Sequence, residues 1–192
     1  MTQPKNISGI ILSGGKSSRM GIDKASLRLD DKTFMEHVIS VMKSFVVDIT
    51  IISDNLEHDA FNLRREEDFI KDSGPLGGLH SGLFYAKHED VLVLSCDIPL
   101  ISKEIVSTLI HNADFSADVN QIESKGKTMP LIALYKKSCR DTFYKFLNDD
   151  ERRVRVVLKS LKTNAIKINS NLDNHVQNIN TKEEFETLKT CK

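Results

Sequence analysis

The sequence carries no net charge, because its 27 Lys and Arg residues are balanced by 27 Asp and Glu residues. A chain without an overall positive field has no long-range means of attracting nucleic acid or an anionic membrane surface. We therefore expect no nucleic-acid partner and no membrane partner. Any binding of phosphate groups must come from a local cluster of residues.

Cysteines are also few, and their pattern excludes two kinds of protein. Cys96, Cys139 and Cys191 are odd in number and far apart, which fits neither a disulfide framework nor the paired spacing of a zinc site. The start of the chain is polar, and no apolar run approaches the length of a membrane span. These absences predict a cytoplasmic protein.

The chain has 192 residues, of which 40% are hydrophobic, so one core and a single domain over residues 1–192 are expected. Three short runs are nearly all apolar, at residues 7–12, 49–52 and 91–94. Such runs predict parallel strands that are covered on both faces. A capping box of Thr33 and Glu36 predicts the start of a helix between the first two strands.

The rest of the chain continues the alternation of helices and strands that is typical of an α/β fold. Between the second and third strands we expect a turn at Gly74 to Gly78 and then a helix through Leu79 and Leu83. Further elements are expected as an antiparallel pair of strands at 117–122 and 131–135, a helix that Ser138 and Asp141 begin, a helix over 151–161, and a last helix capped by Thr181 and Glu184.

A glycine-rich loop follows the first strand directly, at residues 12–21. An open parallel sheet usually binds its ligand at this edge. Glycine lets backbone N–H groups approach phosphate oxygens, and Lys16, Arg19 and Lys24 supply positive charge. These features predict a site for a polyphosphate. The alternative is that the glycines only make a tight turn and the cations are solvated.

Two common phosphate-binding motifs do not fit this loop. The P-loop pattern requires a glycine where the chain has Ile10. The dinucleotide-binding fingerprint also fails, because no third glycine follows Gly14 and Gly15 at the required spacing. If this loop binds phosphate, it therefore does so with a glycine arrangement that differs from both motifs.

Asp97 follows the strand at 91–95 and should lie at the same edge of the sheet as the glycine-rich loop. A carboxylate close to a triphosphate is a suitable ligand for Mg²⁺, which is usually held by one or two carboxylates together with phosphates and water. The alternative role for Asp97 is a turn that leads to a helix after Ser102.

Several blocks of the sequence resemble the MobA-like nucleotidyltransferases. These blocks are residues 12–21 with Asp23-Lys24, the Gly74-Pro75-Leu76-Gly77-Gly78 segment, and Cys96-Asp97-Ile98-Pro99. Later blocks resemble the molybdenum cofactor guanylyltransferases of that family, at residues 130–135, 152–154 and 178–181. The resemblance spans nearly the whole chain. Ser13 and Ile98 depart from the commoner alanine and methionine without removing a charged group.

The resemblance implies a Rossmann-like three-layer sandwich with a mostly parallel sheet and helices on both faces. It also implies Mg²⁺-dependent transfer of GMP from GTP to the molybdenum cofactor, with release of pyrophosphate. By the same resemblance, Lys24, Asp97 and Arg19 would be catalytic and Asp97 would hold the metal. The implied GTP-binding residues are Leu12, Ser13, Gly14, Gly15, Lys24, Asn55 (or Ser53), Asp68, Gly77 and Asp97.

The second substrate is less well defined by the sequence. Arg152, Arg153, Asn178 and Asn180 are candidates to meet a molybdopterin-type molecule, although the arginines could form a solvated face and the asparagines could shape a turn. Partners beyond the small molecules would be transient contacts with cofactor-insertion proteins or molybdoenzymes. Two alternatives remain open: a transferase that uses CTP or activates a sugar or alcohol phosphate, and a carrier that binds without transfer.

Overall fold

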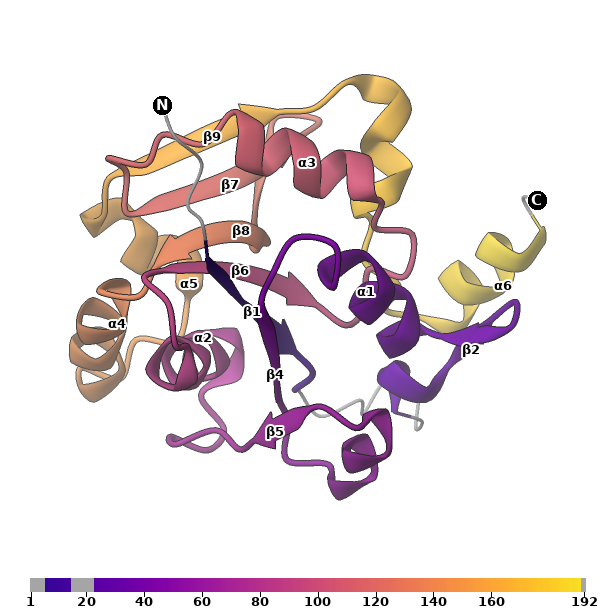
Figure 1. Ribbon diagram of the computed structural model, residues 1–192, viewed down its shortest axis with the longest axis horizontal. Coiled ribbons are helices and arrows are strands. Elements are labelled where there is room, and N and C mark those ends of the chain that lie inside the picture. The colour runs from indigo at the N-terminus through magenta and orange to yellow at the C-terminus, as the bar shows by residue number, and fades with distance from the viewer. Residues whose placement is uncertain (1–5, 15–22, 191–192) are drawn as a thin grey trace.

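A seven-stranded sheet forms the centre of the protein (Figure 1). The computed structural model describes residues 6–14 and 23–190. The strands, in their order across the sheet, are β5 (Arg64–Glu66), β4 (Asp48–Ile52), β1 (Ile7–Leu12), β6 (Asp90–Ser95), β8 (Lys127–Lys136), β7 (Val119–Ser124) and β9 (Thr163–Lys167). Within the described chain, β8 alone runs against the other strands. The predicted mostly parallel sheet is confirmed, as is the antiparallel pairing of β7 with β8.

The first strand shows why the sheet is covered on both faces. All residues of β1 are buried. Ile7 and Ile11 belong to the core on one face, and Ile10 and Leu12 belong to the core on the other. This division follows from the alternation of side chains along a strand. An unbroken apolar run in sequence therefore corresponds to a strand between two layers of helices.

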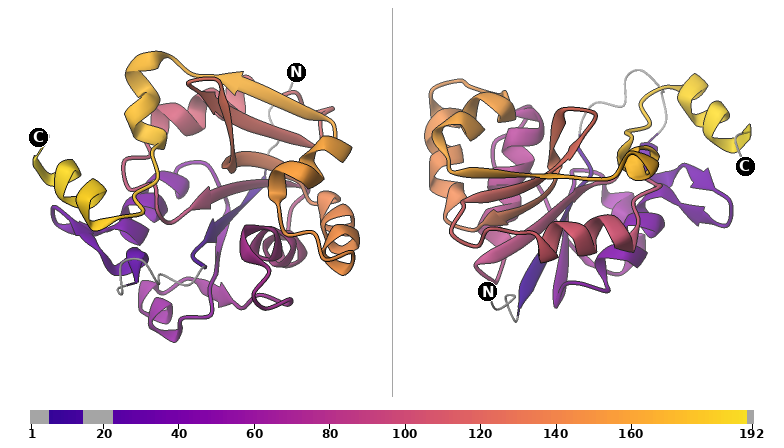
Figure 2. Two further views of the ribbon diagram at one scale, coloured as in Figure 1. Left: turned by 180° about the vertical axis from the view of Figure 1, so that it is seen from behind. Right: turned by 90° about the horizontal axis from the view of Figure 1, so that it is seen from above.

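The helices lie in layers on both sides of this sheet (Figures 1 and 2). One layer contains α1 (Phe34–Met42) and α3 (Lys103–His111), and the other contains α2 (Gly74–Tyr85), α4 (Cys139–Asn148) and α5 (Val154–Val157). The capping box of Thr33 and Glu36 begins α1 as predicted. The three-layer α/β architecture is thus confirmed.

The remaining helix packs at one end of the molecule against a short hairpin. The hairpin consists of β2 (Arg28–Leu29) and β3 (Lys32–Thr33), and the helix is α6 (Lys182–Thr190). The rings of Phe34 and Phe185 meet edge to face, with their centroids 5.6 Å apart. The predicted capping pair, Thr181 and Glu184, is present at the start of α6. This contact brings the end of the chain back to the segment that follows the glycine-rich loop.

One predicted turn is wrong, because the Gly74 to Gly78 segment is the first part of α2. Pro75 fits the first turn of a helix, where a backbone N–H is not needed. Glycines let this helix approach the sheet closely. A Cβ atom on Gly82 would lie 2.7 Å from Cγ2 of Ile10, and one on Gly78 would lie 3.3 Å from Cδ2 of Leu12, both residues of β1.

The predicted helix over residues 151–161 is also wrong in extent. The structure has only α5 followed by a short 3-10 helix, η3 (Leu158–Ser160). The carboxylate of Glu151 accepts hydrogen bonds from the backbone N–H groups of Arg152 and Arg153, and Arg153 has extended backbone angles. These residues therefore form an irregular segment before the helix. The predicted helix at Ser138 exists as α4, but among the described residues the Ser138 side chain makes no capping bond.

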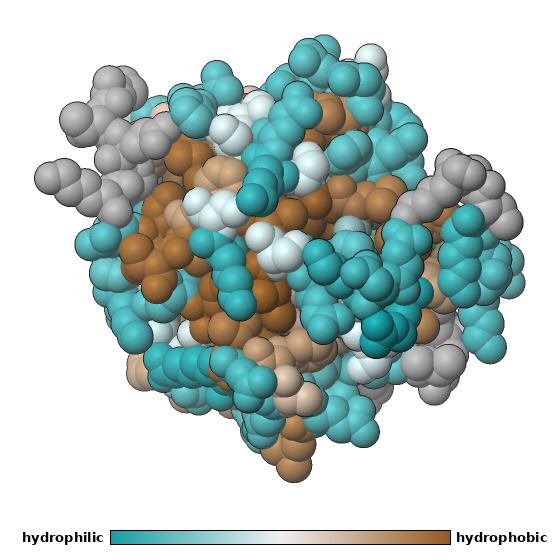
Figure 3. Space-filling model, turned by 45° about the vertical axis from the view of Figure 1, so that its right-hand side comes forward, coloured by the Kyte–Doolittle hydropathy of each residue, from teal (hydrophilic) through white to brown (hydrophobic). Residues whose placement is uncertain are grey.

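The surface is largely hydrophilic, although it leaves some apolar side chains uncovered. On the face shown in Figure 3, hydrophilic residues lie around the margin and hydrophobic residues gather between them. Exposed aromatic residues include Phe69, Phe84 and Tyr144, which lie near α2 and α4. In the described part of the chain, no helix has both the length and the apolar character that crossing a membrane requires.

Candidate active site

The segments that follow three neighbouring strands meet at one edge of the sheet. Leu12 at the end of β1 pairs with Ile52 of β4 and with Ser95 of β6. Backbone hydrogen bonds continue past the strand ends, from Ser13 N–H to the Ile52 carbonyl and from Cys96 N–H to the Leu12 carbonyl, both at 3.0 Å. The glycine-rich loop and Asp97 therefore leave the sheet side by side, as predicted.

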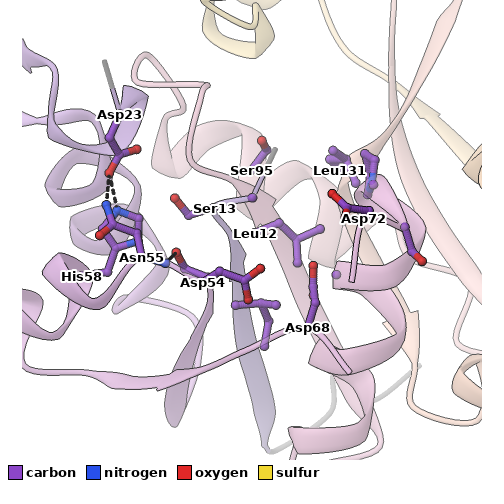
Figure 4. A pocket seen from close by; sticks show the side chains of 17 residues that line it. Leu12, Ser13, Asp23, Asp54, Asn55, His58, Asp68, Asp72, Ser95 and Leu131 are labelled. Carbon is purple, nitrogen blue, oxygen red and sulfur yellow. Dashed lines mark hydrogen bonds and ion pairs between the residues drawn. The ribbon is translucent and has the colours of Figure 1, made fainter. Parts of the chain in front are cut away.

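A cavity of about 660 Å³ opens at this edge (Figure 4). Its size lies within the roughly 300–1,000 Å³ range of small-molecule sites. Leu12, Ser13 and Ser95 lie between the two ends of the cavity. The cavity is therefore bordered by the strand ends to which the sequence assigned phosphate binding.

Asp68 lies at one end of the cavity, between β5 and α2. Its Oδ1 atom is buried and finds no hydrogen-bond partner among residues 6–14 and 23–190. Burial, reinforced by the nearby charge of Asp54, raises the pKa of Asp68 to about 6. An unpaired buried acceptor is costly unless a ligand supplies a donor. The arrangement thus suits a ligand with N–H groups.

Two glycines lie beside the Asp68 carboxylate. A Cβ atom on Gly78 would lie 3.7 Å from Oδ1, and one on Gly14 would lie 4.0 Å from Oδ2. Gly78 lines the cavity, whereas Gly77, the glycine expected from the sequence, instead packs against Ser73. The room for a ligand beside Asp68 therefore comes from Gly14 and Gly78.

A polar cluster lies at the opposite end of the cavity, where Asp23 accepts two side-chain hydrogen bonds (Figure 4). Its Oδ2 atom accepts from Nε2 of His58 at 2.6 Å and from Nδ2 of Asn55 at 2.9 Å. Asn55 also accepts a bond from the backbone N–H of Glu57 at 3.0 Å. Both ends of the Asn55 amide are thus engaged within the protein, although the sequence assigned this residue to GTP.

Lys24 and Asp97 come together beside the cavity, as predicted. The Lys24 Nζ atom lies 4.0 Å from Oδ2 of Asp97 and donates a hydrogen bond of 2.6 Å to Oδ1 of Asn180. Asn178 donates from Nδ2 to Oδ2 of Asp97 at 3.0 Å. The backbone N–H of Ile179 donates to the Asp97 carbonyl at 2.8 Å. The segment before α6 therefore holds both charged groups.

A sequence model of the MobA-like NTP transferase domain matches residues 9–165, which include the cavity. The chain belongs to the MobA-like NTP transferase family. It is therefore a nucleotidyltransferase. The resemblance noted in the sequence is confirmed by this match.

Two relatives carry the name "Probable molybdenum cofactor guanylyltransferase". The protein from Flavobacterium johnsoniae is 33% identical over 184 residues, which cover 96% of this chain and 97% of the relative. The protein from Clostridium perfringens strain SM101 is 36% identical over 191 residues, with 94% and 95% covered. The crystal structure of molybdopterin-guanine dinucleotide biosynthesis protein A from Archaeoglobus fulgidus has a TM-score of 0.81 at 19% identity, over 96% of this chain and 98% of that chain, and so shares the fold.

In this MobA-like transferase, a metal ion would find only a sparse set of ligands. The described ranges contain no group of three or more His, Cys, Asp and Glu residues that could hold a metal. The carboxylate of Asp97 stands with Asn178 and with the hydroxyl of Ser95, which donates to its Oδ1. Such a site fits Mg²⁺, because phosphates and water complete its coordination. Cys96 is a poor further ligand for this ion, because Mg²⁺ prefers oxygen ligands; burial also raises the pKa of its thiol to about 12.

The two arginines assigned to the second substrate are engaged elsewhere. Arg153 pairs with Oε2 of Glu151 at 2.7 Å, and this bond holds the pKa of Glu151 at about 2. Arg152 donates to the Leu147 carbonyl at 2.8 Å. The structure thus places both arginines at the junction of α4 and α5, whereas Asn178 and Asn180 lie at the Lys24 and Asp97 cluster. Arg19 and Gly15 lie outside the described residues.

Proposed function

We propose that this MobA-like protein transfers GMP from GTP to the molybdenum cofactor, forming the guanine dinucleotide form of the cofactor and releasing pyrophosphate. The observation that carries the proposal is the Asp68 carboxylate, whose buried Oδ1 atom has no hydrogen-bond partner among the described residues, in a cavity whose other side adjoins Lys24 and Asp97. The names of the two bacterial relatives point to the same reaction.

Asp68 would recognise the base of the nucleotide. Guanine presents two adjacent N–H donors on its Watson–Crick edge, whereas adenine presents a donor beside an acceptor. An ionised carboxylate can accept from both guanine donors at once, and charge-assisted hydrogen bonds of this kind are strong. The absence of side chains at Gly14 and Gly78 leaves the carboxylate accessible from the cavity. Asp68 therefore favours GTP over ATP.

The phosphates would lie beside the end of β1. Backbone groups of Leu12, Ser13, Gly14 and Gly15 would approach their oxygens, and Lys24 with Arg19 would stabilise the negative charge that develops on the departing pyrophosphate. Asp97 would hold Mg²⁺, which supplies positive charge to the phosphate oxygens when bound. The roles of Lys24 and Asp97 are proposed from the geometry of the described residues. Those of Gly15 and Arg19 are proposed for the part of the loop that lies outside them.

The attacking group would be the terminal phosphate of the second substrate. One of its oxygens forms a bond to the α-phosphorus of GTP, and the bond from that phosphorus to the bridging oxygen of pyrophosphate breaks. The nucleophile is already an anion near neutral pH, so the protein needs no strong general base. Asn178 and Asn180 lie where this substrate would meet Lys24 and Asp97, and we retain Arg152 and Arg153 as predicted contacts with its more distant parts.

The test is a transfer assay with purified molybdenum cofactor, Mg²⁺ and each of the four nucleoside triphosphates. We expect pyrophosphate and the guanine dinucleotide in equal amounts with GTP, and loss of the reaction when EDTA removes the metal. The Asp97→Asn variant should lose activity, while Asp141→Asn, an exposed carboxylate on α4, serves as the matched control. Preference for CTP would replace the guanylyl assignment, and binding without pyrophosphate release would identify a carrier.

A further inference from the structure

The segment that carries Lys24 is fixed by the side chain immediately before it. Asp23 caps the short 3-10 helix η1 (Lys24–Ser26), because its Oδ1 atom accepts from the backbone N–H of Ala25 at 3.1 Å. Ala25 is completely buried in the core. Two neighbours therefore set the backbone position of Lys24. Ala25 is buried in the core, and Asp23 is held by the residues that donate hydrogen bonds to its second carboxylate oxygen, Oδ2.

That second oxygen is held by the protein from another part of the chain. His58 lies on the 3-10 helix η2 (Leu56–Phe61), which follows β4, and only 1% of its surface is exposed. Its Nε2 atom is bonded to Oδ2 of Asp23, and this bond is the main cause that lowers the pKa of Asp23. An ionised carboxylate only accepts hydrogen bonds. His58 must therefore carry its proton on Nε2.

The other ring nitrogen of His58 is enclosed by the protein. Its Nδ1 atom is buried and meets no hydrogen-bond partner within the part of the chain that the structure describes. The ring packs beside Phe61, with centroids 5.8 Å apart. Among the residues that the structure describes, Asp23 is therefore the hydrogen-bond partner through which His58 can influence Lys24.

The helix that carries His58 is itself anchored to the sheet. The Asn55 backbone N–H donates to Oγ of Ser53 at 3.1 Å, and Arg65 bridges the Ser53 carbonyl and Oδ1 of Asp59 at 2.9 and 2.7 Å. His58 is thus attached to β4 and β5 rather than to a free loop. Its bond to Asp23 connects these strands to the turn that carries Lys24.

We propose that His58 is a positioning residue for nucleotidyl transfer, acting through Asp23 to hold Lys24 at the phosphates. This inference rests on the proposed function. Without the His58 donor, Oδ2 of Asp23 would keep only the bond from Asn55, and the less restrained carboxylate would pair with the neighbouring Lys24 ammonium. That ion pair would compete with the developing charge of the departing pyrophosphate. The loss should therefore affect the chemical step more than the binding of GTP.

The experiment compares two substitutions at one position. His58→Gln keeps an N–H donor near the place of Nε2, whereas His58→Leu fills similar space without a donor. We expect His58→Leu to lower kcat about tenfold or more with a change of less than about threefold in the KM for GTP, and His58→Gln to restore kcat to within about threefold of the wild type. His111→Gln, on the exposed end of α3, is the matched control.

The Asp23→Asn variant keeps the test informative if His58→Leu does not fold, and a double-mutant cycle can be completed when both single variants fold. In the wild type both carboxylate oxygens of Asp23 accept hydrogen bonds, whereas asparagine offers only one acceptor oxygen. Asp23→Asn alone should therefore show the same fall in kcat at a nearly constant KM for GTP. If His58 acts through Asp23, the double variant should cost little more than Asp23→Asn alone. The ¹⁵N signals of His58 should also report the Nε2–H tautomer in the wild type.

Three results would overturn the inference. One is an unchanged kcat in a folded His58→Leu or Asp23→Asn variant, and another is a raised KM for GTP at constant kcat, which would make the pair a nucleotide contact. The third is a His58 proton on Nδ1. Failure of the wild type to release pyrophosphate from any nucleoside triphosphate is a separate outcome, which would overturn the proposed function and with it the role of His58.

Discussion

Recognition of guanine by Asp68 should weaken between pH 7 and pH 5, a range in which a carboxylate of ordinary pKa would stay ionised. Burial raises the pKa of this group from 3.8 to about 6, and only the ionised form can accept both N–H groups of guanine. The apparent dissociation constant of GTP then grows as protons compete for the carboxylate. Between pH 7 and pH 5 affinity should fall roughly tenfold, or about 1.4 kcal/mol, since a pKa of 6 leaves about a tenth of the carboxylates ionised at pH 5.

The assay is calorimetric titration of GTP with Mg²⁺ at half-unit steps from pH 5 to pH 8, for the wild type and Asp68→Asn. The terminal phosphate of GTP titrates in the same range, but it does so for both proteins, so the ratio of their affinities isolates Asp68. That ratio should fall as the pH drops through 6. Asp54→Asn removes a charge that raises the Asp68 pKa, so it should move the fall to lower pH. A ratio that is independent of pH would refute the role of Asp68 in base recognition.

Three further substitutions test other parts of the argument. Lys24→Met should lower kcat by about 10²–10³ in the pyrophosphate assay, because a charge at the leaving group is lost; an unchanged rate would exclude this role. Gly82→Ala should lower the free energy of unfolding by about 1–3 kcal/mol in urea, because the new Cβ would lie 2.7 Å from Cγ2 of Ile10; full stability would contradict the close packing. Thr33→Ala should cost about 1 kcal/mol by removing the capping box. Bonds from Thr33 lower the pKa of Glu36 below 4.5, so Glu36 stabilises the fold above that pH, and the cost of Thr33→Ala should shrink as acid protonates Glu36.

The strands at the centre of the sheet could be predicted from the sequence because burial on both faces requires an unbroken apolar run. The edge strands could not. β9 has only Ile166 buried among its five residues, and β5 is the charged segment Arg64–Glu66. Such strands depend on pairing with a neighbour that is distant in sequence, and composition gives no signal of that pairing.

The candidate site was predictable to a similar degree. Asp97 and Lys24 stand beside strand ends that periodicity locates, so their proximity followed from the topology of a parallel sheet. His58 gave no such signal, because it is a single histidine in a polar stretch and its partner is 35 positions away. The amide of Asn55 also showed its attachment to Asp23 only once the fold was known. Hydrogen bonds between loops depend on tertiary placement, which local sequence patterns do not contain.

The position of Asn178 and Asn180 has a consequence for shortened forms of the protein. These residues hold Lys24 and Asp97, which precede them in the sequence by 156 and 81 positions. The residues that line the cavity around Asp68 all lie before them, the last being Leu131. If the proposed function holds, removal of the segment that carries the two asparagines should therefore impair nucleotidyl transfer more than the binding of GTP.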